Sequence, residues 1–174
     1  MTGVDVSQFQ ATVPHADFAI IRVGHGLTED TLWRNHYDDC DHRGMPSGFY
    51  YVPETADATG QARFFKGLVQ SIPHAMGVWL DYAVGDLGSM QPSTAFVDAF
   101  RAAFDCGVYM NSAALIVCWQ YERFERLWYA GAQPPDRWLM RQTGGLDQGA
   151  DIDVAADLGA GIRPGWTGWS WPNL

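Results

Sequence analysis

The sequence has few basic residues: 11 Lys and Arg stand against 20 Asp and Glu, and the formal net charge is −9. Because nucleic-acid binding needs clustered positive charge, we exclude nucleic acid as a partner. The same shortage leaves no polybasic patch for an anionic lipid surface, and no apolar run is long enough to span a bilayer, so we expect no membrane partner. The first residues also lack the basic-then-apolar pattern of a secretory signal peptide.

Cysteine is scarce as well. The three cysteines, Cys40, Cys106 and Cys118, have neither an even count nor metal-ligand spacing, so we expect no disulfide framework. Cys106 and Cys118 stand among apolar neighbours and are typical of small core residues. No histidines join the acids at ligand spacing, so we expect no metal and no cofactor. A lone histidine such as His25 is interpreted as a surface or loop residue.

What is present indicates one globular domain of 174 residues, with 47% hydrophobic residues and 19 glycines. The patterns predict strands at 3–7, 17–23, 47–52, 76–81, 108–111, 137–142 and 150–154, and helices at 31–43, 59–71, 93–105 and 112–128. This alternation predicts an α/β fold, an irregular TIM-like (β/α) barrel over residues 1–158. The Trp-rich stretch 159–174 is interpreted as a C-terminal arm or the start of a linker, and we expect a monomer.

The stretch 78–86 reads VWLDYAVGD, a short apolar run that ends in Asp81. On a strand, Asp81 and position 83 face one side and Tyr82 faces the other. Asp5 stands on the first predicted strand, and Asp151 or Asp153 on the last. In a barrel the carboxyl ends of the strands converge, so these acids can meet in one cleft, although each alone is more often a cap or a turn residue. Converging carboxyls suit glycoside hydrolysis.

An ordered series of short motifs resembles the glycoside hydrolase family 25 lysozymes, the Chalaropsis-type muramidases. The segments that carry it are GVDVSQFQ (3–10), FAIIRV with Gly26 (18–26), GFYYV (48–52), QARFF (61–65), LD (80–81), GVYMN (107–111), LWYA (127–130), Gln142 and DID (151–153). The resemblance implies cleavage of the β-1,4 bond between N-acetylmuramic acid and N-acetylglucosamine in bacterial peptidoglycan. It also implies a bacteriophage endolysin that accumulates in the host cytoplasm before lysis.

The resemblance assigns roles to individual residues. Asp5 would stabilise positive charge on the floor of the cleft, Asp81 would orient the site and assist the nucleophilic step, and Asp151 would be the last-strand acid. Tyr50, Tyr109 and Gln142 would line the sugar-binding cleft.

Position 83, where the family has its proposed general-acid glutamate, is Ala83. Alanine cannot donate a proton, so we expect this chain to hydrolyse its substrate very slowly, if at all. Two origins fit: a deliberate substitution, which the intact surrounding motifs favour, or a natural loss or relocation of the acid. The only nearby replacement is Asp86, whose facing is wrong for an extended strand unless Gly85 bends the chain.

Two rival interpretations stay open. The first, from a different class, is a peptidoglycan-binding module on a catalytically dead barrel. The second is an unrelated (β/α)-barrel enzyme, which would have to explain the ordered motif series.

Overall fold

The computed structural model describes residues 1–123, 126–131, 139–145 and 151–155. Its strands are β1 Thr2–Val6, β2 Phe18–His25, β3 Thr28–Glu29, β4 Ser47–Val52, β5 Val78–Asp81, β6 Gly107–Asn111, β7 Leu127–Ala130, β8 Met140–Gly145 and β9 Asp151–Ala155. Its α-helices are α1 Trp33–His42, α2 Ala58–Val69, α3 Thr94–Ala103 and α4 Ser112–Val117, and a 3₁₀-helix, η1, spans Trp119–Arg123.

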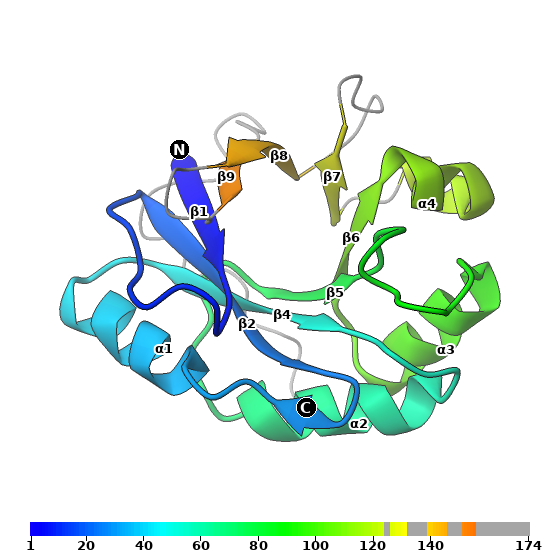
Figure 1. Cartoon of the computed structure of the whole chain (residues 1–174), viewed down its shortest axis with the longest axis horizontal. Coiled ribbons are helices and arrows are strands. Elements are labelled where there is room, and N and C mark those ends of the chain that lie inside the picture. The colour runs from blue at the N-terminus through cyan, green and yellow to red at the C-terminus, as the bar shows by residue number, and fades with distance from the viewer. Residues whose placement is uncertain (124–125, 132–138, 146–150, 156–174) are drawn as a thin grey trace.

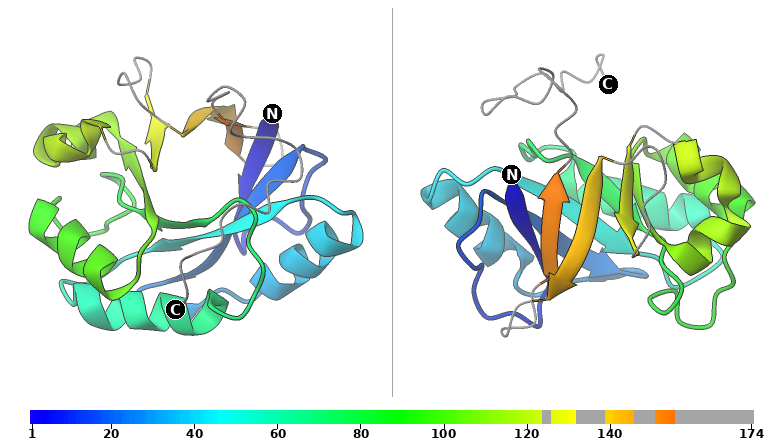
Figure 2. Two further views of the ribbon diagram at one scale, coloured as in Figure 1. Left: turned by 180° about the vertical axis from the view of Figure 1, so that it is seen from behind. Right: turned by 90° about the horizontal axis from the view of Figure 1, so that it is seen from above.

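The strands form one sheet that closes on itself. From β1 through β2, β4, β5, β6 and β7 to β8, each strand pairs in parallel with the next. The last strand, β9, lies antiparallel between β8 and β1 and completes the ring. The short strand β3 is a hairpin partner of β2 outside this ring. The single-domain α/β barrel predicted from the sequence is confirmed, and the antiparallel β9 is one source of its irregularity (Figures 1 and 2).

Side chains alternate between the two faces of the barrel wall, as the two-residue period of strands requires. On β4, Tyr50 belongs to an inner cluster, whereas Tyr51 belongs to an outer cluster between sheet and helices. The β5 region alternates likewise: Trp79 is inner, and Leu80 and Tyr82 are outer. The inner cluster, which packs the barrel interior, consists of Phe18, Ile20, Tyr50, Val52, Trp79, Ala83, Tyr109, Trp128 and Met140.

The helices cover the outside of the barrel (Figure 1). On α3 the buried residues are Phe96, Val97 and Phe100, which form an apolar stripe at helical spacing. Just after α1, Gly44 has φ +63°, a left-handed conformation that glycine adopts without a steric penalty. On α1 the buried residues are Trp33, His36 and Cys40, and Leu32 is the N-cap residue.

The helix predicted over 112–128 is wrong in its second half. The α-helix ends at Val117, a 3₁₀-helix follows, and residues from Leu127 form strand β7. A short apolar run fits either a helix or a strand. Parallel pairing with β6 on one side and β8 on the other decides for the strand.

Ser93 and Gly107 lie on either side of α3. Ser93 is the N-cap residue of α3, but its side chain makes no capping hydrogen bond. Gly107 begins β6, where a Cβ atom would lie 2.3 Å from Cε3 of Trp79. Glycine is therefore needed there for close packing rather than for a left-handed turn.

All three cysteines are free and buried, which confirms the core role expected for Cys106 and Cys118. Within the described residues, no helix is both long and apolar enough to cross a bilayer. The same part of the chain contains no group of three or more His, Cys, Asp or Glu side chains placed to hold a metal ion. The predicted arm at 159–174 lies outside the described residues.

Candidate active site

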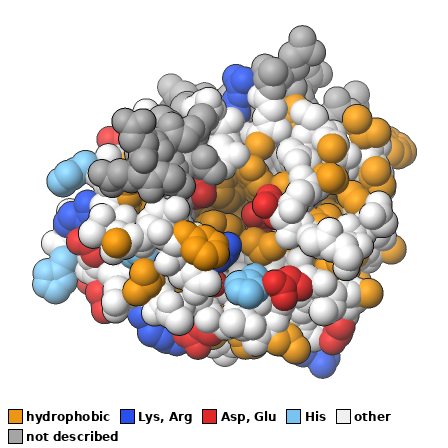
Figure 3. All heavy atoms as spheres, viewed as in Figure 1, with side chains coloured by type: hydrophobic (Ala, Val, Ile, Leu, Met, Phe, Trp, Pro, Cys, Tyr) orange, Lys and Arg blue, Asp and Glu red, His pale blue; other side chains and the backbone are white. Residues whose placement is uncertain are grey.

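A cleft of about 410 Å³ opens at the end of the barrel where the parallel strands terminate. It is lined by Asp5, Phe9, Arg22, His25, Tyr50, Val52, Glu54, Asp81, Gly85, Asp86, Tyr109, Trp128 and Gln142. The molecular surface is hollowed here, with a hydrophobic floor and acidic side chains beside it (Figure 3). In (β/α) barrels this end of the strands is where catalytic residues gather.

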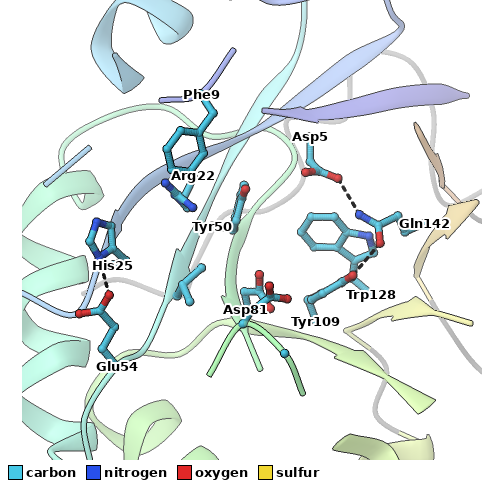
Figure 4. A pocket seen from close by; sticks show the side chains of 13 residues that line it. Asp5, Phe9, Arg22, His25, Tyr50, Glu54, Asp81, Tyr109, Trp128 and Gln142 are labelled. Atoms are coloured by element: carbon cyan, nitrogen blue, oxygen red, sulfur yellow. Dashed lines mark hydrogen bonds and ion pairs between the residues drawn. The ribbon is translucent and has the colours of Figure 1, made fainter. Parts of the chain in front are cut away.

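Asp5 from β1 and Gln142 from β8 lie side by side, although 137 positions separate them in the chain. The Gln142 amide donates a hydrogen bond from Nε2 to Oδ2 of Asp5 at 3.1 Å, and its Oε1 accepts one from the Tyr109 hydroxyl at 2.6 Å. This chain of bonds fixes the orientation of the amide, because each end of Gln142 has a partner of defined polarity (Figure 4). It also holds the Asp5 carboxyl, which is 8% exposed, in the cleft.

Asp81, the last residue of β5, is buried at 7% exposure and points into the same cleft (Figure 4). Burial raises the pKa of Asp81 well above its usual range, and the nearby charges of Asp86 and Asp5 raise it further. The Ala83 N–H, which donates a hydrogen bond to Oδ1 at 3.2 Å, and the Arg22 guanidinium act in the opposite direction. A carboxyl of this kind can hold a proton nearer to neutral pH than an exposed one.

Aromatic rings form one wall of the cleft. Trp128 on β7 is the central ring: Tyr109 lies 4.6 Å from it, and Tyr50 and Trp79 each pack edge-on at 6.0 Å between ring centroids. Burial, with Asp5 and Asp81 close by, raises the pKa of Tyr50 well above its ordinary value, so its hydroxyl stays protonated as a hydrogen-bond donor. Such a wall offers flat apolar faces with polar atoms at their edges.

The opposite rim carries a cation and an exposed ring. Arg22 on β2 pairs through Nε with Oδ2 of Asp30 at 2.7 Å, and its guanidinium lies 5.0 Å from the centre of the Phe9 ring. Phe9 is 76% exposed. At the edge, Nδ1 of His25 lies 2.6 Å from Oε1 of Glu54. His25 is therefore a cleft-rim residue with an acidic partner, a more specific position than the surface or loop placement expected from sequence.

Position 83 lies beyond the end of β5, but its side chain still belongs to the inner cluster, at 2% exposure. Tyr82 turns the other way, as predicted, and stacks on Phe96 with ring centroids 5.3 Å apart. The Ala83 methyl group thus lies on the same face of the barrel wall as Asp81. The methyl group of alanine has no proton to donate, so Ala83 cannot take part in proton transfer.

The structure brings together most of the residues selected from sequence. Asp5, Asp81, Tyr50, Tyr109 and Gln142 all line the cleft. Asp151 lies on β9 with its Cα opposite that of Asp5, and its side chain is outside the described part of the structure. The roles assigned to these residues remain predictions.

Sequence reasoning missed Trp128, Arg22 and Phe9 as lining residues. The signal for Trp128 was its position in the LWYA motif, which the predicted helix obscured. Asp86 was noted only as a conditional replacement, and the structure places it in the cleft.

No protein-family model matches the sequence, and no curated protein sequence is significantly similar to it. In contrast, several solved structures have a backbone fold that superposes on most of this chain. A family GH25 lysozyme from Aspergillus fumigatus superposes with a TM-score of 0.69 at 20% identity, over 89% of this chain and 93% of that one. This chain has the fold of the GH25 lysozymes.

Two further structures share the GH25 fold. The modular autolysin LytC from Streptococcus pneumoniae superposes with a TM-score of 0.72 at 15% identity, over 89% of this chain. This chain spans only 46% of LytC. The CTP1L endolysin superposes with a TM-score of 0.67 at 21% identity, over 90% of this chain and 66% of the endolysin.

Proposed function

We propose that this chain is a peptidoglycan hydrolase domain. Its cleft binds a glycan strand and cleaves the β-1,4 bond between N-acetylmuramic acid and N-acetylglucosamine, slowly because position 83 is alanine. The observation that carries the proposal is the meeting of Asp5 and Asp81, from distant strands, in one cleft with an aromatic wall. A glycosidase needs carboxyls on either side of the scissile bond, and sugar rings stack on aromatic faces.

The charge of the cleft fits this chemistry. The carboxyls of Asp5 and Asp81 face a centre where cleavage of a glycosidic bond develops positive charge. Gln142 and Tyr109 also line the cleft, and their amide and hydroxyl groups are of the kind that hydrogen-bond sugar hydroxyl and acetamide groups. The lining also includes Arg22, whose positive charge offsets part of the negative charge of the acidic side chains Asp5, Glu54, Asp81 and Asp86.

The structural neighbours support the substrate and the setting. LytC has been solved in complex with a synthetic peptidoglycan ligand, and it superposes on 89% of this chain in that state as well. The likeness to the CTP1L endolysin supports a bacteriophage lysis protein, which would accumulate in the host cytoplasm and act on the cell wall after release.

Ala83 favours a second candidate function, a binding module that retains the glycan cleft without turnover. A general acid or base contributes about 10²–10⁴ in rate. Loss of the proton donor alone could therefore reduce hydrolysis to a level that serves only binding. The two candidates share the cleft and differ only in turnover.

The experiment that separates them is the substitution Ala83→Glu, with Ala83→Gln as a matched control of similar size that cannot act as a general acid. The present chain and both variants are tested for retention on purified peptidoglycan and for release of reducing sugar. Because position 83 is 2% exposed, burial would raise the pKa of a glutamate there toward neutrality, which suits a proton donor.

We expect all three proteins to be retained, and Glu alone to raise the rate by about 10²-fold or more. A folded Ala83→Glu protein with no gain would contradict the lost-acid interpretation, and it would leave the binding module if the present chain also releases no reducing sugar. Failure of every variant to bind peptidoglycan would refute the proposed function altogether.

A further inference from the structure

The chain turns back on itself directly after Ala83. The Asp86 N–H donates a hydrogen bond to the Ala83 carbonyl at 3.1 Å, and Gly85 has φ +113°. A four-residue turn with this bond brings its first and last Cα atoms within about 7 Å, and a positive φ at its third position calls for glycine. The bend at Gly85 therefore returns Asp86 to the neighbourhood of position 83.

This turn is anchored on both sides of Asp86. On one side, the Asn111 amide grips the peptide groups of Val84: its Nδ2 donates to the Val84 carbonyl at 2.8 Å, and its Oδ1 accepts from the Val84 N–H at 3.2 Å. On the other side, Leu87 is 1% exposed and packs into the outer cluster. The residue between these anchors has a defined position at the cleft.

The Asp86 carboxyl shares the cleft with Asp81 and Arg22. After burial, the negative charge of Asp86 is the next cause of the raised pKa of Asp81, so the two carboxyls interact across the cleft. Asp86 itself is at the exposed rim, but the cleft walls desolvate its carboxyl in part and raise its pKa, while Arg22 lowers it. The cleft thus holds one buried and one rim carboxyl, two different environments side by side.

We propose that Asp86 donates the proton to the leaving glycosidic oxygen, in place of the glutamate missing at position 83. This proposal rests on the proposed function, since it requires a glycan strand in the cleft. The Asp86 O–H bond breaks as its proton passes to the glycosidic oxygen, and the bond from the anomeric carbon to that oxygen breaks with both electrons going to the oxygen. Water then adds its oxygen to the anomeric carbon and returns a proton to the Asp86 carboxylate.

The test is a comparison of Asp86→Asn in two backgrounds, the present chain and Ala83→Glu. Release of reducing sugar from purified peptidoglycan is measured for each protein, together with retention on the same material. Asp38→Asn is the matched control, because Asp38 is exposed on α1 outside the cleft and the same substitution removes the same charge. Asp86→Glu serves as the conservative variant.

In the present chain we expect Asp86→Asn to lower the residual rate at least tenfold, since a general acid contributes about 10²–10⁴. Asp38→Asn is expected to change it less than twofold, and Asp86→Glu to retain most of it. In the Ala83→Glu background, Asp86→Asn is expected to change the rate less than threefold, because Glu then supplies the proton. The alkaline limb of the residual pH–rate profile is expected to disappear with Asp86→Asn.

Three outcomes would overturn the role of Asp86: no residual hydrolysis in the present chain, an unchanged rate in Asp86→Asn, or an equal loss in both backgrounds. Each leaves the proposed function intact as long as peptidoglycan is retained and Ala83→Glu gains activity. If the strand is not retained and Ala83→Glu remains inactive, the proposed function itself fails.

Discussion

The side-chain amide of Asn111 makes three hydrogen bonds, so the loss of stability on its removal can be worked out from the structure. Its Oδ1 accepts from the N–H groups of Ala114, at 3.0 Å, and of Val84, at 3.2 Å, and its Nδ2 donates to the Val84 carbonyl at 2.8 Å. The first bond caps the N-terminus of α4, and the other two hold the turn that carries Asp86. The substitution Asn111→Ala removes all three.

The expected cost follows from these contacts. Loss of an N-cap costs about 1 kcal/mol. Each of the two bonds to Val84, which are near the surface, contributes roughly 0.5–1 kcal/mol. The free energy of unfolding should therefore fall by about 2–3 kcal/mol, which for a domain of this size lowers the melting temperature by roughly 4–12 °C.

The matched control is Asp57→Ala. Asp57 caps α2 by accepting a hydrogen bond from the Gly60 N–H at 2.9 Å and is not a lining residue of the cleft. It should cost about 1 kcal/mol, the value of the cap alone. Asn111→Asp is the finer probe, because it keeps the two acceptor bonds and replaces the donor to the Val84 carbonyl with a charged acceptor that repels it.

Urea unfolding followed by tryptophan fluorescence measures the stability of each protein, and release of reducing sugar measures the residual rate. Asn111→Ala should lose both stability and rate, whereas Asp57→Ala should lose stability only. Equal stability costs for Asn111→Ala and Asp57→Ala, with the residual rate unchanged in both, would refute the claim that Asn111 positions the turn.

Two further predictions concern the buried acid and the aromatic wall. Because burial raises the pKa of Asp81 above 3.8, the folded state favours the neutral carboxyl. The present chain should therefore lose stability relative to Asp81→Asn as the pH rises from about 4 through the raised pKa. Equal stability of the two proteins from pH 3 to pH 8 would contradict this cost of burying the charged carboxyl. Gly107→Ala should destabilise the barrel by about 1–3 kcal/mol and weaken retention on peptidoglycan. The reason is that the new methyl group would lie 2.3–2.4 Å from two ring carbons of Trp79, which packs on Trp128. A variant as stable in urea as the present chain would show instead that the Trp79 ring moves freely.

Local patterns were sufficient for much of the fold. Strand–helix alternation predicted the barrel, and the two-residue period of strands placed Asp81 in the cleft and Tyr82 on the outer face. Both follow from interactions between neighbours in the chain, which short windows of sequence record. The expected clustering of strand-end acids needed one more rule, that parallel strands present their carboxyl ends on one side of a barrel.

Long-range pairing decided what local pattern could not. The LWYA segment was predicted to end a helix, and it became β7 because β6 and β8 offer hydrogen-bonding partners on both sides. With that strand, Trp128 moved from a helix end to the centre of the cleft wall. A short window of sequence cannot predict this strand pairing, since the partner strands lie in other segments of the chain.

The sequence by itself determined which reactive side chains this protein has. It places acids at the ends of strands in a muramidase-like series of motifs, with alanine at the position of the proton donor. Only the tertiary structure decided that Asp86 lies near position 83. Its place depends on the positive φ of Gly85 and on the hydrogen bonds between Val84 and the side-chain amide of Asn111, which belongs to another strand. A turn fixed from outside its own segment cannot be read from the residues within it.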